Sequence, residues 1–309
     1  MPSLGTLWPY IIQGLAFGGV YAVTGTGLVV LYRTTGVVNL AFGAIGTIAA
    51  HAAWSVLGGT LANPSPKGVG WRLLGYPALV AVSAGITLLY GMWIAPKLSR
   101  RDPLVKALGM VGVALLLLGF MKERWDTSKP RALPIPRRTF KVGGAVVTTT
   151  QVLALVFALA VVLLVSLFLT KSSTGTAMRA IANDREVSAL LGVPVRRIEG
   201  LAWLASGTIC GLVYLMLPDL FNGLDQGILT WFVIGALAGA IVGQFRSLWV
   251  TFGASIVIGV VESGLAAFNH GSVKFLSTFR KLTPFVVAVV AILWISRRRT
   301  VVLAGREMR

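Results

Sequence analysis

One acidic residue, Glu262, lies deep inside an apolar stretch of this 309-residue chain and is the first candidate for chemistry. It falls about 14 residues into that stretch, which corresponds to about 21 Å along a helix. A carboxylate at such a depth is costly unless it lines a polar path, pairs with a cation such as Lys274 or Arg280, or reaches interfacial water. Interfacial placement is the simplest of these interpretations, and the path remains the functional alternative.

A second set of polar residues accompanies a glycine-rich apolar segment that is short for a membrane span. Unwound backbone at membrane depth supplies polar groups to a solute path, so a broken segment is a natural place for one. Helix–helix hydrogen bonding would use the same residue types, and both interpretations stay open. The candidate path residues are Tyr21, Thr24, Thr26, Asn39, Phe42 and Glu262.

Other chemistry has no support in the residue pattern. The chain has one cysteine, Cys210, so an internal disulfide is excluded. His51 and His270 are expected near membrane interfaces, and without a ligand cluster we predict no metal site. No Gly-x-x-x-x-Gly-Lys-Ser/Thr phosphate loop occurs, so we expect this chain not to hydrolyse ATP and to be a transport subunit rather than an enzyme.

The composition indicates a membrane protein. Hydrophobic residues make up 56% of the chain and charged residues 12%, whereas soluble domains carry about 25% charged residues. The net charge of +18 is spread between apolar runs, which favours anionic lipid headgroups and an orientation signal over nucleic acid. The first apolar run, Trp8–Leu31, is too long for a signal peptide and is expected to be retained.

We predict an all-α polytopic membrane protein that forms a single domain over residues 1–309. A span needs about 20 apolar residues, and nine segments qualify approximately. The second and ninth are short, so eight full spans is an alternative to nine. The segments are 8–31, 37–57, 76–95, 104–121, 151–170, 198–217, 227–245, 248–268 and 282–296.

Basic residues suggest the orientation of these spans. With the C-terminus in the cytoplasm and nine spans, 16 of the 28 Lys and Arg residues face inwards and the N-terminus faces outwards. The long loop 122–150 is then outside, and alternation around Gly143-Gly144 predicts a small β-hairpin. This loop either docks an external partner or is an ordered cap without one.

Glycine pairs spaced by four residues predict close helix packing. Gly235, Gly239 and Gly243 form one stripe, and Gly14/Gly18 and Gly207/Gly211 form two further pairs. Packing within the chain is the simpler interpretation and a subunit interface the alternative. The segments 14–21 and 207–214 also echo each other, but four identities in eight residues favour coincidence over an internal repeat.

The cytoplasmic loop 171–197 carries the most informative pattern. Asn183 is a candidate N-cap, with Glu186 at the capping-box position, while Gly192 and Pro194 mark the end of a helix of about two turns. Its apolar face, which is formed by Val187, Leu190 and Leu191, must rest on the membrane domain or on a cytoplasmic protein, since so short a helix is marginal alone.

The stretch Arg179–Gly192 resembles the cytoplasmic coupling segment of branched-chain amino-acid ABC importer permeases, with their pattern Arg-Ala-x-Ala-x-Asp-x-x-x-Ala-x-Leu-Leu-Gly. Residues 14–31 are similar to the first span of that family, and Gly36–Gly43 resembles its Gly-x-x-Asn-Phe-Ala-x-Gly motif. The likeness extends over about residues 10–296, and the chain resembles the shorter of the two permease types. It departs at Phe42-Gly43-Ala44, where many members have His-Gly-Glu, and at 244–249, where members usually have Gly-Ser-x-x-Gly.

The resemblance implies a permease subunit of the bacterial inner membrane that moves branched-chain or other amino acids, or related small polar solutes. Its partners would be a second permease, identical or related, two ATPases that bind ATP and Mg, an extracytoplasmic binding protein, and membrane lipids. The implied ATPase-coupling residues are Arg179, Asn183, Asp184, Glu186, Val187, Leu190, Leu191 and Gly192. An ATPase-independent secondary transporter or channel is the alternative, although it would require paired ionisable residues at mid-membrane.

Overall fold

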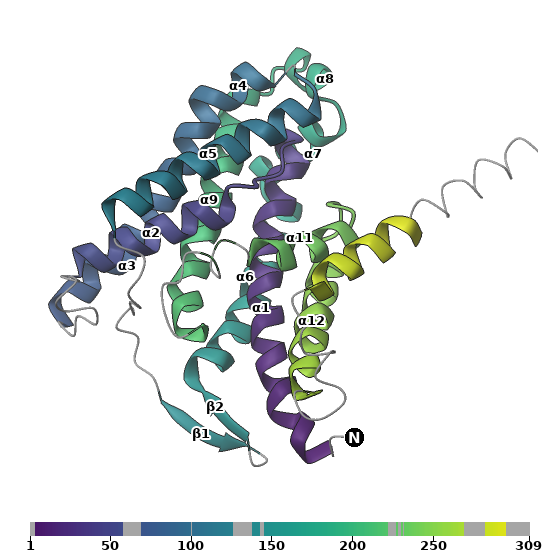
Figure 1. Ribbon diagram of the computed structural model, residues 1–309. Helices are drawn as coiled ribbons and strands as arrows, with labels where there is room; N and C mark the ends of the chain where they lie inside the picture. Colours follow the sequence, from purple (N-terminus) through teal and green to yellow (C-terminus); the bar gives the residue numbers. More distant parts are fainter. Residues whose placement is uncertain are drawn as a thin grey trace, which may run out of the picture.

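The computed structural model describes residues 4–57, 69–99, 101–125, 138–142, 145–221, 227, 230, 232–268 and 282–294. Nearly all of the described chain is helical (Figure 1). The first half consists of α1 (Leu4–Thr35), α2 (Phe42–Val56), α3 (Val69–Leu89), the π-helical turn η1 (Tyr90–Ile94), α4 (Ala95–Leu98) and α5 (Pro103–Arg124). The remainder consists of β1 (Thr139–Val142), β2 (Ala145–Thr148), α6 (Thr149–Lys171), α7 (Ser173–Asn183), α8 (Arg185–Leu190), α9 (Val195–Leu220), α11 (Val233–Val242), α12 (Leu248–Leu265), η2 (Ala266–Phe268) and a last helix, Thr283–Trp294.

Each of the nine apolar segments contains a helix, but among the described residues only six helices are long and apolar enough to cross a membrane. The protein is therefore a multi-pass membrane protein. The three shorter apolar helices are Phe42–Val56, Val233–Val242 and Thr283–Trp294. Short helices were expected at the second and ninth segments, whereas the seventh was expected to be a full span and its described helix covers only Val233–Val242.

The two ends of the molecule differ in structure. The expected hairpin is present: β1 and β2 pair antiparallel with Thr139 opposite Thr148, and they lie at the same end as the N-terminus (Figure 1). The glycines 143 and 144 lie outside the described residues. At the opposite end are α4, α7 and α8. This arrangement agrees with the expectation that the N-terminus and the hairpin share one side of the membrane, with the coupling loop on the other.

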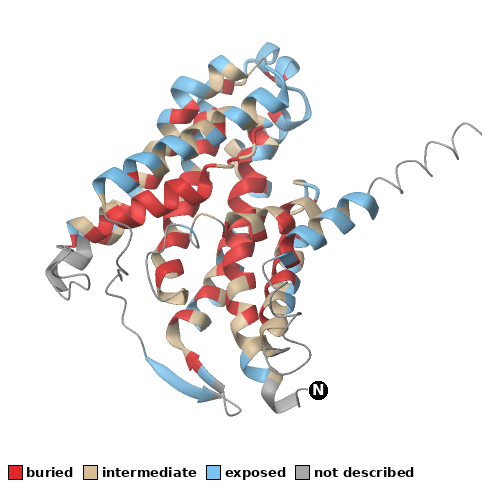
Figure 2. Ribbon diagram, viewed as in Figure 1, coloured by how far each residue is buried: buried red, intermediate tan, exposed pale blue. Residues whose placement is uncertain are grey.

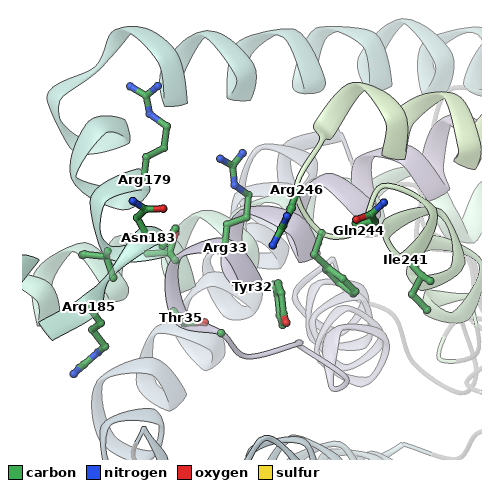
Figure 3. A pocket seen from close by; sticks show the side chains of 14 residues that line it. Tyr32, Arg33, Thr35, Arg179, Asn183, Arg185, Ile241, Gln244 and Arg246 are labelled. Carbon is green, nitrogen blue, oxygen red and sulfur yellow. The ribbon is translucent and has the colours of Figure 1, made fainter. Parts of the chain in front are cut away.

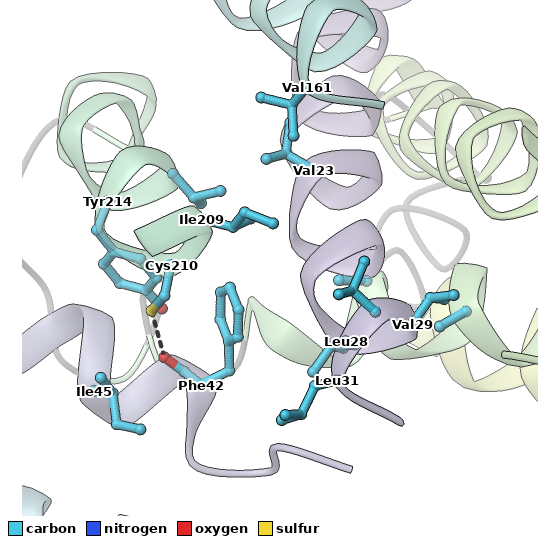
Figure 4. Packing of buried hydrophobic residues seen from close by; sticks show 14 of the residues in the cluster. Val23, Leu28, Val29, Leu31, Phe42, Ile45, Val161, Ile209, Cys210 and Tyr214 are labelled. Atoms are coloured by element: carbon cyan, nitrogen blue, oxygen red, sulfur yellow. Dashed lines mark hydrogen bonds between the residues drawn. The ribbon is translucent and has the colours of Figure 1, made fainter. Parts of the chain in front are cut away.

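Helix α1 is the centre of the structure, and it contacts α6, α7, α9, α11 and α12. Figure 2 shows its middle part buried, whereas α5 carries exposed side chains such as Leu115 and Leu116. Exposed leucines on a helix of this hydropathy are expected to face lipid. In the core, Phe42 packs near Ile209 of α9 and the Cys210 thiol donates to the Phe42 carbonyl oxygen at 3.3 Å (Figure 4).

Glycines allow the closest helix contacts, and all of these contacts lie within this chain. A Cβ atom at Gly18 would lie 2.6 Å from the Ile256 Cα of α12, and one at Gly14 would lie 2.5 Å from the Val260 Cα. On α9, Gly207 and Gly211 are equally close to the backbone of α3, at Ala84 and Val80. No larger residue fits at such distances without moving a helix.

The two echoing segments occupy equivalent positions. The glycines of α1 pack on α12 while Tyr21 lies against Gly235 of the short helix α11. The glycines of α9 pack on α3 while Tyr214 lies against Gly46 of the short helix α2. Since α1 and α9 run antiparallel, the triads α1–α2–α3 and α9–α11–α12 have the relation of an inverted repeat, in which the first helix of each packs on the other triad. The structure therefore favours a repeat over coincidence.

The antiparallel course of α1 and α9 follows from two contacts. Phe17, near the start of α1, stacks on Phe221 at the end of α9 with ring centroids 5.0 Å apart. Gly27, ten residues after Phe17 on α1, lies against Ile209, which precedes Phe221 on α9. The contacts thus progress in opposite directions along the two helices.

Replacing Gly18 by alanine tests the close contact of α1 with α12. We expect Gly18→Ala to lower the free energy of unfolding by about 2 kcal/mol, because the added methyl group meets backbone that cannot move aside. Gly112→Ala in α5 is the matched control, since nothing lies within 4 Å of the added atom; it should leave stability unchanged or slightly raised. Thermal unfolding in detergent would measure both, and equal stability of the two variants would contradict this packing.

Candidate functional site

The loop 171–197 contains two helices rather than one, since α7 precedes the expected short helix. The Ser172 hydroxyl caps α7 by accepting from the Gly175 amide at 2.9 Å. Gly175, Met178 and Ile181 are buried, and a Cβ at Gly175 would lie 2.6 Å from the Leu169 Cα of α6. The sequence contained a signal that could have predicted α7, namely a serine cap followed by buried positions at helical spacing.

Helix α8 is capped at both ends, although its N-cap differs from the expected residue. The Asp184 carboxylate accepts from the amides of Glu186 and Val187, both at 2.9 Å. Asn183 is instead the last residue of α7, so the interpretation of Asn183 as the N-cap was wrong: the chain breaks between helices one residue later. Gly192 has a φ of +82° and ends the helix as expected, with its amide bonded to the Ala189 carbonyl.

An ion pair holds α8 against α9. The Arg185 guanidinium donates to both carboxylate oxygens of Glu199, at 2.7 and 3.3 Å. This hydrogen bond raises the pKa of Arg185 above its usual value. Two parallel bonds of this kind define orientation as well as adding energy. The short helix is thus positioned by its caps and by one bidentate pair.

The apolar face of α8 does not rest on the membrane domain. Leu190 is 88% exposed, Leu191 is 79% exposed and Val187 is 48% exposed. Glu186 of the same helix and Arg179 of α7 are also exposed. The described part of the chain therefore leaves this face uncovered in this conformation.

Tyr21 and Glu262 meet between α1 and α12. The Tyr21 hydroxyl donates to a Glu262 carboxylate oxygen at 2.8 Å, and the Tyr21 ring stacks on Phe232 with centroids 4.5 Å apart. Glu262 is half-buried and contacts α1 through Tyr21. Lys274 and Arg280, its other possible partners, lie outside the described residues.

The other candidate path residues serve different roles. Asn39 and Thr24 are buried, and within the described chain the Asn39 amide group and the Thr24 hydroxyl have no hydrogen-bond partner. Thr26 donates to the Ala22 carbonyl of its own helix at 2.8 Å, and Phe42 is fully buried in the core. Asn39 lies in the unwound stretch between Gly36, at a φ of +67°, and the start of α2.

The glycine stripe of α11 packs inside the chain. Gly235 contacts Tyr21, Gly239 contacts Ser255 and Gly243 contacts Thr251. The stripe therefore seats α11 on α1 and α12, as the simpler of the two interpretations expected.

His51 is fully buried among helices. Its Nδ1 lies 2.9 Å from the Thr47 carbonyl oxygen. The packing of α2 against α3, α5 and α9 encloses it. Among the described residues no group of three or more His, Cys, Asp or Glu side chains could hold a metal ion; His270 lies outside them.

Comparison with known proteins identifies the family. The sequence profile described as "Branched-chain amino acid transport system / permease component" matches residues 10–295. The chain belongs to this family. It is 23% identical over 304 residues to the high-affinity branched-chain amino acid transport system permease protein BraD of Pseudomonas aeruginosa PAO1, covering 95% of each chain. It is 20% identical to the corresponding protein LivH of Escherichia coli K12, over 88% of this chain and 90% of LivH. No solved structure matches the chain.

Replacing Asp184, and separately its neighbour Asn183, by alanine tests the corrected N-cap of α8. Asp184→Ala should destabilise α8 by about 1 kcal/mol, because two amides lose their acceptor. Asn183→Ala is the control and should leave α8 unaffected. Hydrogen exchange of the α8 amides in the purified chain would distinguish the variants; faster exchange in Asn183→Ala alone would restore the original assignment.

Removing the Tyr21 hydroxyl tests the contact between α1 and α12. Tyr21→Phe should lower the free energy of unfolding by about 2 kcal/mol, since the hydroxyl donates to a carboxylate. Glu262→Gln keeps an acceptor oxygen and should cost less, while Tyr10→Phe removes a hydroxyl elsewhere on α1 and should cost little. If Tyr21→Phe costs as much in a Glu262→Ala background as alone, the two side chains are not coupled.

Proposed function

We propose that this chain is a transmembrane permease subunit of an ABC importer in the bacterial cytoplasmic membrane. In this proposal a second permease, identical or related, completes the pathway, and two cytoplasmic ATPases supply the energy by binding ATP and Mg. An extracytoplasmic binding protein delivers a branched-chain or other amino acid, or a related small polar solute. The C-terminus lies in the cytoplasm.

The exposed apolar face of α8 carries this proposal. Leu190 and Leu191 are among the most exposed large apolar side chains of the described chain, and they sit on a helix that its caps and the Arg185–Glu199 pair hold in place. Exposed apolar side chains on an ordered element mark a binding surface for another protein. An ATPase that covers this face could transmit its motion through α7 and α8 to α1, α6 and α9, which they contact.

The opposite end offers a different surface for the binding protein. Val146 is exposed on the face of the hairpin that it shares with Lys141, whereas Phe140 lies on the opposite face with its partner Val147, which is buried and anchors the hairpin. Arg138 and Phe140 are also exposed. Exposed apolar side chains flanked by positive charge fit a partner with an acidic rim. We assign this hairpin to contact with the binding protein.

The translocation path in this proposal runs along Tyr21, Thr24, Asn39 and Glu262. Thr24 and Asn39 are buried, and their side-chain polar atoms have no hydrogen-bond partner in the described chain. Such groups lower stability unless they bind a polar ligand or water in another conformation of the transporter. Thr26 and Phe42 contribute to the walls through their helix and core contacts.

One aspartate substitution at each end of the molecule tests the assignment of α8 to the ATPases and of the hairpin to the binding protein. Leu190→Asp should abolish co-purification of ATPase subunits from the same organism, because it places an unpaired carboxylate in an apolar interface. Val146→Asp is the control at the opposite end; it lies across the strand pair from Lys141, so the hairpin should remain folded.

The expected pattern is reciprocal. Leu190→Asp should retain association with the binding protein, and Val146→Asp should retain the ATPase and weaken the binding protein by about tenfold, a loss typical of one central interface residue. Solute uptake without any ATPase subunit would favour a secondary transporter. Unchanged ATPase association in Leu190→Asp would show that α8 is not the coupling element.

A further inference from the structure

A basic cavity lies at the α7 end of the molecule, beside α8 but separate from its exposed apolar face. Its volume is about 950 Å³, and the end of α1, the end of α7 and the α11–α12 turn enclose it (Figure 3). Arg33, Arg179 and Arg246 each come from a different one of these elements. Val187, Leu190 and Leu191 are not part of its lining.

These three arginines have no acidic partner among the residues that the structure describes. Among the described residues no carboxylate lies within ion-pair distance of any of them, and the Arg179 guanidinium donates only to the Thr176 hydroxyl, at 3.2 Å. Arg185 also borders the cavity, but Glu199 already binds it. Arg33 and Arg179 lie close enough for their charges to repel each other. Cations that line one cavity without a counter-charge among the described residues favour a bound anion.

The turn that contributes Arg246 is strained. Gln244 and Phe245 have φ values of 53° and 51°, a left-handed conformation that side chains other than glycine seldom adopt. The Phe245 ring lies on Tyr32 with centroids 4.6 Å apart, and this contact holds the turn over the end of α1. Gln244 and Arg246 are thereby held at the cavity. Strain of this kind gathers at binding sites, because the surrounding structure must maintain it.

The cavity lies at the depth of lipid headgroups. Trp8 is half-exposed near the start of α1, as expected of an interfacial tryptophan. From Trp8 to Arg33 the helix rises about 37 Å, compared with about 30 Å for the hydrocarbon layer. Arg33 therefore lies just beyond the hydrocarbon on the opposite face. Ile241 and Phe245 add an apolar wall, and α12 begins beside them with exposed Trp249 and Val250.

We propose that this cavity binds the phosphate-bearing headgroup of an anionic phospholipid from the membrane leaflet at the α7 end. Arg33, Arg179 and Arg246 bind the phosphate, since guanidinium groups match its geometry, and Gln244 donates to the remaining oxygens. The acyl chains follow the apolar wall toward α12. Because the cavity joins α7 to α1 and to the α11–α12 turn, a bound lipid stabilises the position of α7. The inference requires only a membrane protein and is independent of the ATPase partnership.

Lipid titration of the purified full-length chain, followed by native mass spectrometry, tests this proposal. Phosphatidylglycerol should bind more tightly than phosphatidylcholine with the same acyl chains. Replacing Arg33, Arg179 and Arg246 by glutamine should weaken phosphatidylglycerol binding by about fivefold for each arginine. Replacing the same three residues by lysine keeps the charges but loses the guanidinium geometry, so it should restore part of the binding that the glutamine variants lose, which separates lost charge from lost folding.

The matched control removes equal charge at the same end of the molecule. Arg101, Arg196 and Arg197 are exposed there and lie outside this cavity, so their replacement by glutamine should leave the preference for phosphatidylglycerol unchanged. An equal loss in this control would show general surface attraction. Displacement of the lipid by millimolar inorganic phosphate would indicate a soluble anion, and loss of ATPase co-purification with unchanged lipid binding would indicate an acidic protein partner. Each of these three outcomes would overturn the assignment.

Discussion

The close backbone contact of α1 with α12 is the constraint on which the rest of the structure depends. Lipid offers no hydrophobic reason for helices to associate, so contact must come from dispersion between backbones that small residues allow to approach. Gly14, Gly18 and Gly259 provide that approach on one side, and Gly207 and Gly211 provide it between α9 and α3. Both contacts place a tyrosine ring over a glycine of a short helix, which is how α2 and α11 are held.

This packing leaves distinct surfaces at the two ends of the chain. At one end α7 packs on α6, and in the neighbouring helix α8 the side chains of Leu190 and Leu191 are exposed. On the other side of α7, three arginines from separate elements surround one cavity. The proposed protein contact on α8 and the proposed lipid contact on α7 therefore act on two adjoining helices, one through apolar burial and the other through charge.

The sequence predicted local features of the structure better than features that depend on distant residues. The helices, the hairpin over 139–148 and the glycine at the end of α8 follow from periodicity and turn chemistry, which act within a few residues. The N-cap was assigned one residue too early, because Asn183 and Asp184 are both good caps and only the break after α7 distinguishes them. Helix α7 was missed although its serine cap was visible in the sequence, and α11 ends at Val242, before the expected end of the seventh segment at residue 245, because apolar composition alone does not show where a helix ends.

The sequence by itself determined the membrane class, the order of apolar segments, the family and the residues that form α8, since composition, spacing and motif are local properties. Only the tertiary structure decided that Glu262 meets Tyr21, that His51 is buried, and that Arg33, Arg179 and Arg246 share a cavity. These residues are far apart along the chain, and their meeting depends on which helix faces touch. That choice is made by close packing of small residues in lipid, which no single segment encodes.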